Sequence, residues 1–241
     1  MMQEPKPGIK PGSWLESVNC AIEGILWTAR SQRHMRWHCV AAVVALFLAL
    51  FWRINALEFA LLALAVTLVL FAELVNTSIE VVVDLVSPNF HPLAQRAKDV
   101  AAGAVLVASI GAMVIGYLAL SHRALPGLEE VVGSLAKQPP GELSVVSGLI
   151  VIILVVLLKA RYGKGTPLHG GMPSGHAALA FSIATSIVLA EVPPILSLLI
   201  VGMATMVSHS RLLLKIHTLR EVIAGAVLGV GVTIAIHLVF S

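Results

Sequence analysis

Long apolar stretches dominate the chain, and short polar segments separate them. A helix needs about 20 mostly apolar residues to cross a bilayer, so the pattern predicts membrane-spanning helices. Seven stretches qualify, near residues 35–53, 56–83, 99–120, 143–159, 174–191, 194–210 and 221–240. Helices are expected because a bilayer offers backbone groups no water to bond. The predicted fold is therefore an all-α integral membrane protein.

Two polar regions lie outside the apolar stretches. Residues 11–32 are too polar to span, but their apolar side chains recur at helical spacing, at Trp14, Val18, Ile22, Ile25 and Trp27. This spacing is typical of a helix lying on the membrane surface. Residues 121–142 are rich in proline, glycine and glutamate, which indicates a linker. We therefore expect a three-span bundle with an N-terminal surface helix (1–120), a linker (121–142) and a four-span bundle (143–241).

Composition and charge fit this division. The chain is 58% hydrophobic and 12% charged, whereas a soluble domain has about 25% charged residues, so a water-soluble globule is excluded. If the N-terminus lies in the cytoplasm and the spans alternate in direction, all but three of the 16 Lys and Arg residues lie on the cytoplasmic side. The exceptions are Arg53, Arg123 and Lys137. That bias follows the positive-inside rule. The basic charge therefore indicates membrane orientation, and no nucleic-acid partner is expected.

The second apolar stretch carries a stripe of polar side chains. Spacings of 3, 4 and 4 place four residues on one helical face, namely Glu73, Asn76, Glu80 and Asp84. A charge at mid-bilayer costs about 2.5–3.5 kcal/mol, so these acids must face a bundle interior, a metal or water. Lys98 and Asp99 follow the next loop. Carboxylates beside a lysine suit metal-dependent phosphoryl chemistry or ion transport, and the residues alone leave that choice open.

Three segments of this half carry a family resemblance: 29–34 (ARSQRH), 73–84 (ELVNTSIEVVVD) and 91–99 (HPLAQRAKD). Through them residues 13–120 resemble the prokaryotic diacylglycerol kinase and undecaprenol kinase family, especially its Gram-positive undecaprenol kinase branch. The resemblance implies a homotrimer in the bacterial inner membrane that phosphorylates a lipid alcohol with ATP and Mg²⁺. It implies that Glu73 is the base for the lipid hydroxyl and Glu80 a Mg²⁺ ligand. Nucleotide and phosphate contacts are implied for Asn76, Lys98 and Asp99.

The kinase-like half departs from this family pattern. Gln32 stands where the family usually has a metal-binding glutamate, so the predicted metal site comprises Glu80 and Gln32. Basic residues are usual at the positions of Ser13, Glu16 and Glu23. Both differences should weaken MgATP binding. They leave open the alternative that only the other half of the chain is active.

The second half carries cations, glycines and histidines in two polar segments, 159–176 (KARYGKGTPLHGGMPSGH) and 208–221 (SHSRLLLKIHTLRE). Cations and glycines ahead of a helix suit an anion site. His217 and Glu221 are one helical turn apart, so the carboxylate can orient the imidazole. Such an imidazole can act as a nucleophile or a base.

These segments resemble the type 2 phosphatidic-acid phosphatase superfamily, whose motifs are Lys-x6-Arg-Pro, Pro-Ser-Gly-His and Ser-Arg-x5-His-x3-Asp. The second motif is intact at 173–176, and the third runs from Ser210 to Glu221, with glutamate replacing the aspartate. The first keeps Lys159 and Pro167 but has Thr166 in place of the arginine.

The second resemblance implies hydrolysis of a lipid phosphate or diphosphate through a phosphohistidine, without a metal or other cofactor. His217 would attack phosphorus, Glu221 would orient it, and His176 would protonate the leaving oxygen. The phosphoryl oxygens would be bound by Lys159, Ser174, Gly175 and Arg211.

Together the halves predict a bifunctional enzyme of membrane lipids. One half would phosphorylate undecaprenol or diacylglycerol, and the other would hydrolyse a lipid phosphate such as undecaprenyl diphosphate, with both sites facing the cytoplasm. Two further alternatives stay open: a lipid phosphotransferase, in which a second lipid replaces water, and a non-enzymatic ion or lipid transporter. A transporter would leave the Pro-Ser-Gly-His motif, Arg211 and His217 unexplained.

Overall fold

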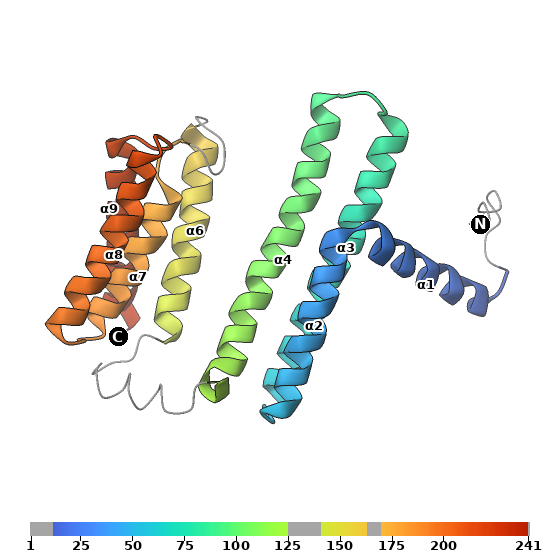
Figure 1. The fold of residues 1–241 in the computed structure, drawn as a ribbon, viewed down its shortest axis with the longest axis horizontal. Helices are drawn as coiled ribbons and strands as arrows, with labels where there is room; N and C mark the ends of the chain where they lie inside the picture. Colours follow the sequence, from blue (N-terminus) through green and yellow to red (C-terminus); the bar gives the residue numbers. More distant parts are fainter. Residues whose placement is uncertain (1–11, 125–140, 163–169, 241) are drawn as a thin grey trace. The chain divides into compact units, whose positions relative to one another are not determined.

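The computed structural model describes residues 12–124, 141–162 and 170–240, and throughout these ranges the regular structure is helical (Figure 1). The contacts divide the chain into two compact units, Met1–Leu125 and Pro126–Ser241. Six helices in the described ranges are long and apolar enough to cross a membrane. The prediction of an all-α, multi-pass membrane protein is confirmed.

The first unit contains α1 (Trp14–Ser31), α2 (Arg33–Phe51), α3 (Ala56–Val86) and α4 (Pro92–Ala124). Figure 1 shows α2, α3 and α4 running alongside one another, with α1 turning away from the start of α2. Gln32 forms this corner because its backbone is extended, with φ −99° and ψ 119°, which ends one helix and begins the next. Its side chain is thereby placed at the end of the bundle.

Helix α1 occupies the segment in which the sequence predicts a surface helix. The Ser13 hydroxyl caps it by accepting a hydrogen bond from the backbone N–H of Glu16. All five apolar side chains of the predicted stripe are exposed in the unit. An interfacial helix beside a membrane bundle has such an exposed apolar stripe. That α1 lies on the membrane surface stays a prediction.

The second unit contains α6 (Glu142–Tyr162), α7 (Gly175–Leu189), α8 (Pro194–Leu213) and α9 (Leu219–Phe240). Helix α7 lies at the centre and contacts the other three helices. Its buried side chains are all small, namely Ala177, Ala178, Ser182, Ala184 and Ser186. Small residues let membrane helices approach closely. The opposing face of α9 is small as well, since Gly225 and Gly229 lie against the α7 backbone.

Helix α7 is shorter than the span predicted for this segment. It has 15 residues and is roughly 22 Å long, which is shorter than the hydrocarbon core of about 30 Å. The first unit thus has three helices of spanning length and the second unit has three, with α7 as a shorter apolar helix. The division into three plus four spans stays a prediction. The linker predicted at 121–142 lies mostly outside the described residues, and α4 continues to Ala124.

Candidate active sites

The polar stripe of α3 runs from the bundle interior to its open end. Glu73, Asn76 and Thr77 are buried, Glu80 is half-buried, and Asp84 is exposed. The predicted base therefore lies deepest, while the predicted metal ligand lies nearer the end of the helix.

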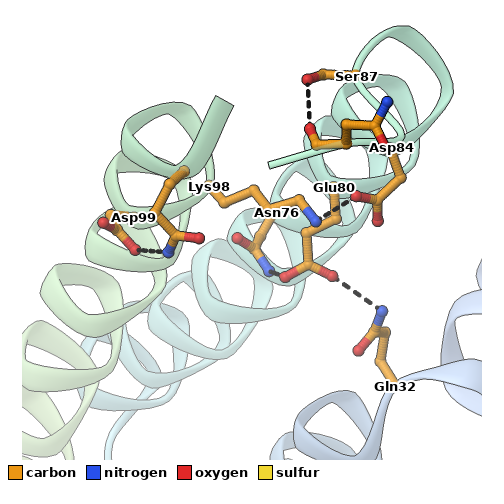
Figure 2. Close-up of polar contacts among 9 residues, drawn as sticks. Gln32, Asn76, Glu80, Asp84, Ser87, Lys98 and Asp99 are labelled. Carbon is orange, nitrogen blue, oxygen red and sulfur yellow. Dashed lines mark hydrogen bonds and ion pairs between the residues drawn. The ribbon is translucent and has the colours of Figure 1, made fainter. Parts of the chain in front are cut away.

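Glu80 is held by two amide side chains. Gln32 Nε2 donates to one carboxylate oxygen of Glu80 at 3.1 Å, and Asn76 Nδ2 donates to the other at 2.9 Å. Figure 2 shows Gln32 reaching Glu80 from the corner between α1 and α2, with Asn76 one turn away on α3. The structure thus brings three of the predicted site residues together.

Lys98 and Asp99 point to different partners. Lys98 forms an ion pair with Asp84, across from α4 to α3 (Figure 2). The Asp99 carboxylate accepts a hydrogen bond from Gln95 Nε2 at 2.8 Å, within its own helix. Neither side chain contacts the Glu80 cluster, which consists of Glu80, Gln32 and Asn76. The predicted nucleotide and phosphate residues are therefore divided between this cluster and the separate contacts of Lys98 and Asp99.

The Glu80 cluster suits a Mg²⁺ ion carried by phosphates. Mg²⁺ is usually bound through one or two carboxylates together with substrate phosphates. The cluster offers the Glu80 carboxylate and the amide oxygens of Gln32 and Asn76, and Asn76 Oδ1 is buried without a hydrogen-bond partner among the described residues. In that part of the chain, no group of three or more His, Cys, Asp or Glu residues has the arrangement of a metal site.

Glu73, the predicted base, has a neighbour that the sequence pattern does not predict. Nε2 of His38 on α2 lies 3.2 Å from a carboxylate oxygen of Glu73. The Glu73 side chain is 4% exposed, and that of His38 is 27% exposed. A signal was available, since an ionisable side chain inside an apolar span is a functional candidate by default. The same criterion identifies the acids of α3, and it applies equally to His38 in the first apolar stretch.

His38 also borders an apolar cleft. The cleft has a volume of about 300 Å³ and lies between α2, α3 and α4. Beyond His38 it is lined by small and aliphatic side chains, including Ala42, Ala45, Ala65 and Val69. Glu73 is not among the lining residues, so the imidazole lies between the cleft and the buried carboxylate.

In the second unit, the start of α7 is held against the start of α9. Ser174 is the N-cap of α7 and Gly175 its first residue, and the backbone N–H of Ser174 donates to the backbone carbonyl of Glu221 at 2.9 Å. In the preceding loop, Gly170 and Gly171 have φ of 77° and 81°, a conformation that glycine adopts without strain. Nζ of Lys159 on α6 donates to the carbonyl of Gly170 at 3.1 Å. Three of the predicted phosphate-binding residues therefore meet at one end of the unit.

The side chains of His217 and Glu221 contact each other. Its Nδ1 lies 2.8 Å from Oε2 of Glu221, and the backbone N–H of Thr218 donates to the same oxygen at 3.0 Å. The His217 side chain is 1% exposed. Because an ionised carboxylate only accepts, Nδ1 carries the proton and the lone pair of Nε2 is left free of that contact.

Two cationic side chains lie near His176 at the start of α7. Lys159 and Arg211 both act electrostatically on the exposed imidazole of His176. Lys159 in turn interacts with the Glu221 charge. A cleft of about 230 Å³ begins at Lys159, Gly175 and His176 and continues along apolar side chains of α6, among them Val151 and Val155. Thr166 and Pro167 lie outside the described residues.

A glycine that the site motifs do not include permits this arrangement. A Cβ atom on Gly225 would lie 2.3 Å from the carbonyl oxygen of Ser174. Only a residue without a side chain fits there. The available signal was the pair of glycines four residues apart in the last apolar stretch, a spacing typical of close helix packing in membranes.

Comparisons with known proteins divide the chain in the same way. Residues 19–120 match the family described as prokaryotic diacylglycerol kinase, and residues 154–241 match the PAP2 superfamily. A diacylglycerol kinase of Synechocystis sp. is 39% identical over 122 residues, which is 46% of this chain and 70% of that protein. An undecaprenol kinase of Bacillus subtilis is 39% identical over 98 residues, or 41% of this chain and 80% of that protein.

A diacylglycerol kinase of Escherichia coli is 39% identical over 84 residues, covering 34% of this chain and 69% of that protein. No solved structure matches the chain. All three of these relatives are kinases, and the assignment of the second unit rests on the PAP2 match together with its motifs and geometry. The chain therefore belongs to the prokaryotic diacylglycerol kinase family through residues 19–120, and it joins that domain to a PAP2 superfamily domain at residues 154–241.

Proposed function

We propose that this protein is a bifunctional enzyme of bacterial inner-membrane lipids. Its first half phosphorylates a lipid alcohol, undecaprenol or diacylglycerol, with MgATP. Its second half hydrolyses a lipid phosphate or diphosphate, such as undecaprenyl diphosphate. The observation that carries the proposal is that each unit has its own polar site, one built around Glu73 and Glu80 and the other around His217 and Glu221.

In the phosphatase half, the contacts support attack by His217. Nε2 of His217 attacks phosphorus while Glu221 holds Nδ1, and the bond from phosphorus to the leaving oxygen breaks. His176 supplies the proton to that oxygen, and water then hydrolyses the phosphohistidine. The phosphoryl oxygens are bound by Lys159, Arg211 and the backbone at Ser174 and Gly175, where the N-terminus of α7 favours an anion. We call this group of residues the phosphate cradle.

In the kinase half, Glu73 supplies the basic carboxylate that activates the lipid hydroxyl. The apolar cleft beside it suits the hydrocarbon part of the lipid. Glu80, with the amide oxygens of Gln32 and Asn76, would hold the Mg²⁺ of MgATP, which would supply positive charge to neutralise the phosphates. Lys98 and Asp99 would complete the nucleotide and phosphate contacts after exchanging their present partners.

The arrangement in the membrane is also a proposal. We place both sites on the cytoplasmic side, where ATP is available, with residues 1–120 and 143–241 as the two domains. A homotrimer formed through the kinase half fits the family resemblance. With both sites on one face, the two halves must act on different lipids or at different times, because opposing action on one lipid would only consume ATP.

Two assays of the purified full-length protein test the proposal. The first measures transfer of phosphate from ATP to undecaprenol or diacylglycerol with Mg²⁺ present. The second measures phosphate release from undecaprenyl diphosphate with EDTA present. The proposal predicts activity in each assay, with phosphate release unaffected by EDTA. Absence of lipid phosphorylation or of phosphate release would remove the corresponding half of the proposal.

A further inference from the structure

Helix α9 begins with a capping box, which is a pair of reciprocal hydrogen bonds across the first turn. The helix starts at Leu219, so Thr218 is its N-cap residue and Glu221 its third residue. The Thr218 carbonyl accepts from the backbone N–H of Val222 at 3.1 Å, as an N-cap carbonyl does. The backbone N–H of Thr218 donates to Oε2 of Glu221 at 3.0 Å, and the backbone N–H of Glu221 donates to the Thr218 hydroxyl at 3.4 Å. A threonine followed three residues later by a glutamate is the sequence pattern of this motif.

The carboxylate of this capping box is also the partner of His217. Oε2 of Glu221, the oxygen that accepts from Thr218, lies 2.8 Å from Nδ1 of His217. The two donors belong to adjacent residues of the chain, so a single oxygen serves both. The Glu221 side chain is 20% exposed, and that of His217 is 1% exposed. The bond that caps the helix therefore also fixes where the carboxylate meets the imidazole.

The backbones of His217 and Glu221 are held by other helices. The carbonyl of Glu221 accepts from the backbone N–H of Ser174 at the start of α7, and the backbone N–H of His217 donates to the carbonyl of Arg211 on α8 at 3.2 Å. The Glu221 carboxylate also interacts with the backbone of Gly171 in the preceding loop. Because both backbones are fixed in this way, the length and conformation of the side chain at position 221 decide whether its carboxylate reaches Nδ1.

The capping box accounts for a departure from the superfamily motif. That motif ends in aspartate, whereas this chain has glutamate at position 221. A capping box uses glutamate or glutamine at the third helical residue, because its side chain must reach back to the N-cap N–H. An aspartate side chain is one methylene shorter. It keeps the charge beside His217 but lacks the reach that the box requires.

We propose that Thr218 is a positioning residue of the phosphatase site and that it acts through Glu221. The capping box holds the carboxylate at Nδ1 of His217, and it makes glutamate, in place of aspartate, the residue that functions at position 221. This inference rests on the proposed phosphatase function of the second half. It adds a residue to the site, since Thr218 occupies one of the unspecified positions of the third motif.

The first test compares Glu221→Asp with wild type. The measurement is single-turnover phosphate release from a lipid phosphate with the protein in saturating excess, where the rate constant reports the chemical step. We expect the rate constant to fall about 100-fold, because a displacement of about 1 Å in a preorganised site costs that much. The matched control is Leu219→Ala, at an exposed position of the same turn, which should release phosphate at the wild-type rate.

The tautomer of His217 gives a readout that a purely structural role of the cap would not change. The ¹⁵N resonances of this histidine are those that disappear in His217→Ala. In wild type they should report a proton on Nδ1, and in Glu221→Asp they should report a mixture of the two neutral tautomers.

The second test compares Thr218→Val with Thr218→Ser. Valine has the shape of threonine without its hydroxyl, whereas serine keeps a hydroxyl that can accept from the Glu221 N–H. The backbone N–H of residue 218 remains in both variants, so the effect should be smaller than that of Glu221→Asp. We expect the rate constant of Thr218→Val to be about fivefold below that of Thr218→Ser, the change in equilibrium that loss of a typical N-cap produces.

Two results would overturn the inference: a wild-type rate constant and tautomer in Glu221→Asp, or equal rate constants in Thr218→Val and Thr218→Ser. If Glu221→Asp fails to fold, the two Thr218 variants still decide the question. Failure of the proposed function has a different signature. Wild type would then release no phosphate from a lipid phosphate, or His217→Ala would release it at the wild-type rate.

Discussion

The backbone N–H of Ser174 donates a hydrogen bond of 2.9 Å to the backbone carbonyl of Glu221. This bond joins the N-cap of α7, where the proposed phosphate cradle begins, to the residue that orients the proposed nucleophile. Two motifs separated by more than 30 residues in the sequence thus share one backbone contact. Their relative position depends on how closely α7 and α9 pack.

Gly225→Ala tests that dependence. A Cβ there would lie 2.3 Å from Ser174 O, so the two helices must separate and the Ser174–Glu221 bond must lengthen. We expect phosphate release to fall about 100-fold, because a displacement of about 1 Å costs that much in a preorganised site. The control is Gly231→Ala, whose Cβ would meet nothing within 4 Å. Equal activity in the two variants would show that the close approach does not position the site.

Glu221→Gln tests the orienting carboxylate. The amide can keep hydrogen bonds to His217 and Thr218, but it loses the charge that stabilises the histidine during attack. The comparable change in a serine protease lowers kcat about 10⁴-fold, and we expect a loss of at least about 100-fold in phosphate release. The measurement is single-turnover release from a lipid phosphate. Retention of more than half of the rate would contradict the assigned role.

Gln32→Glu tests the proposed metal site at Glu80. A second carboxylate beside Glu80 adds a ligand of the kind that Mg²⁺ prefers, so the KM for MgATP should fall about tenfold. Without Mg²⁺ the two like charges should repel and lower the melting temperature of the variant below that of wild type. Added Mg²⁺ should raise the melting temperature of the variant above that of wild type. A variant with lower stability at every Mg²⁺ concentration and an unchanged KM would argue against a metal at Glu80.

The buried hydrogen bond between Ser182 and Thr233 makes a prediction about stability. The two hydroxyl oxygens lie 2.8 Å apart between α7 and α9. Ser182→Ala or Thr233→Val alone leaves the other hydroxyl unpaired and should lower the free energy of unfolding by about 1–2 kcal/mol. The double variant should lose less than the sum of the two single losses. Strict additivity in unfolding measurements would mean that the bond makes no contribution.

The helices and most of the proposed site residues could be predicted from the sequence because membrane segments obey strong local rules. Apolar length defines a span, and a charge inside a span is costly enough to be noticed. The contacts of Glu80 with Gln32 and Asn76 could not be predicted in the same way, since Gln32 reaches Glu80 only because the chain turns a corner at residue 32.

His38 and Gly225 show where pattern recognition stops. His38 acquires its significance from Glu73 on another helix, and Gly225 acquires its significance from a backbone carbonyl on α7. Both are tertiary contacts between helices, and the spacing of residues along one helix does not predict them. The length of α7 is a similar case, because the apolar stretch near 174–191 continues past the point where the helix ends at Leu189.

We propose that a single chain holds two separate catalytic sites, one that phosphorylates a lipid alcohol and one that hydrolyses a lipid phosphate. The most direct measurement assays lipid phosphorylation and phosphate release on the same preparations of wild type, Glu73→Ala and His217→Ala. Glu73→Ala should lose lipid phosphorylation and keep phosphate release, and His217→Ala should do the reverse. Loss of both activities in either variant, or of neither in both, would contradict the claim.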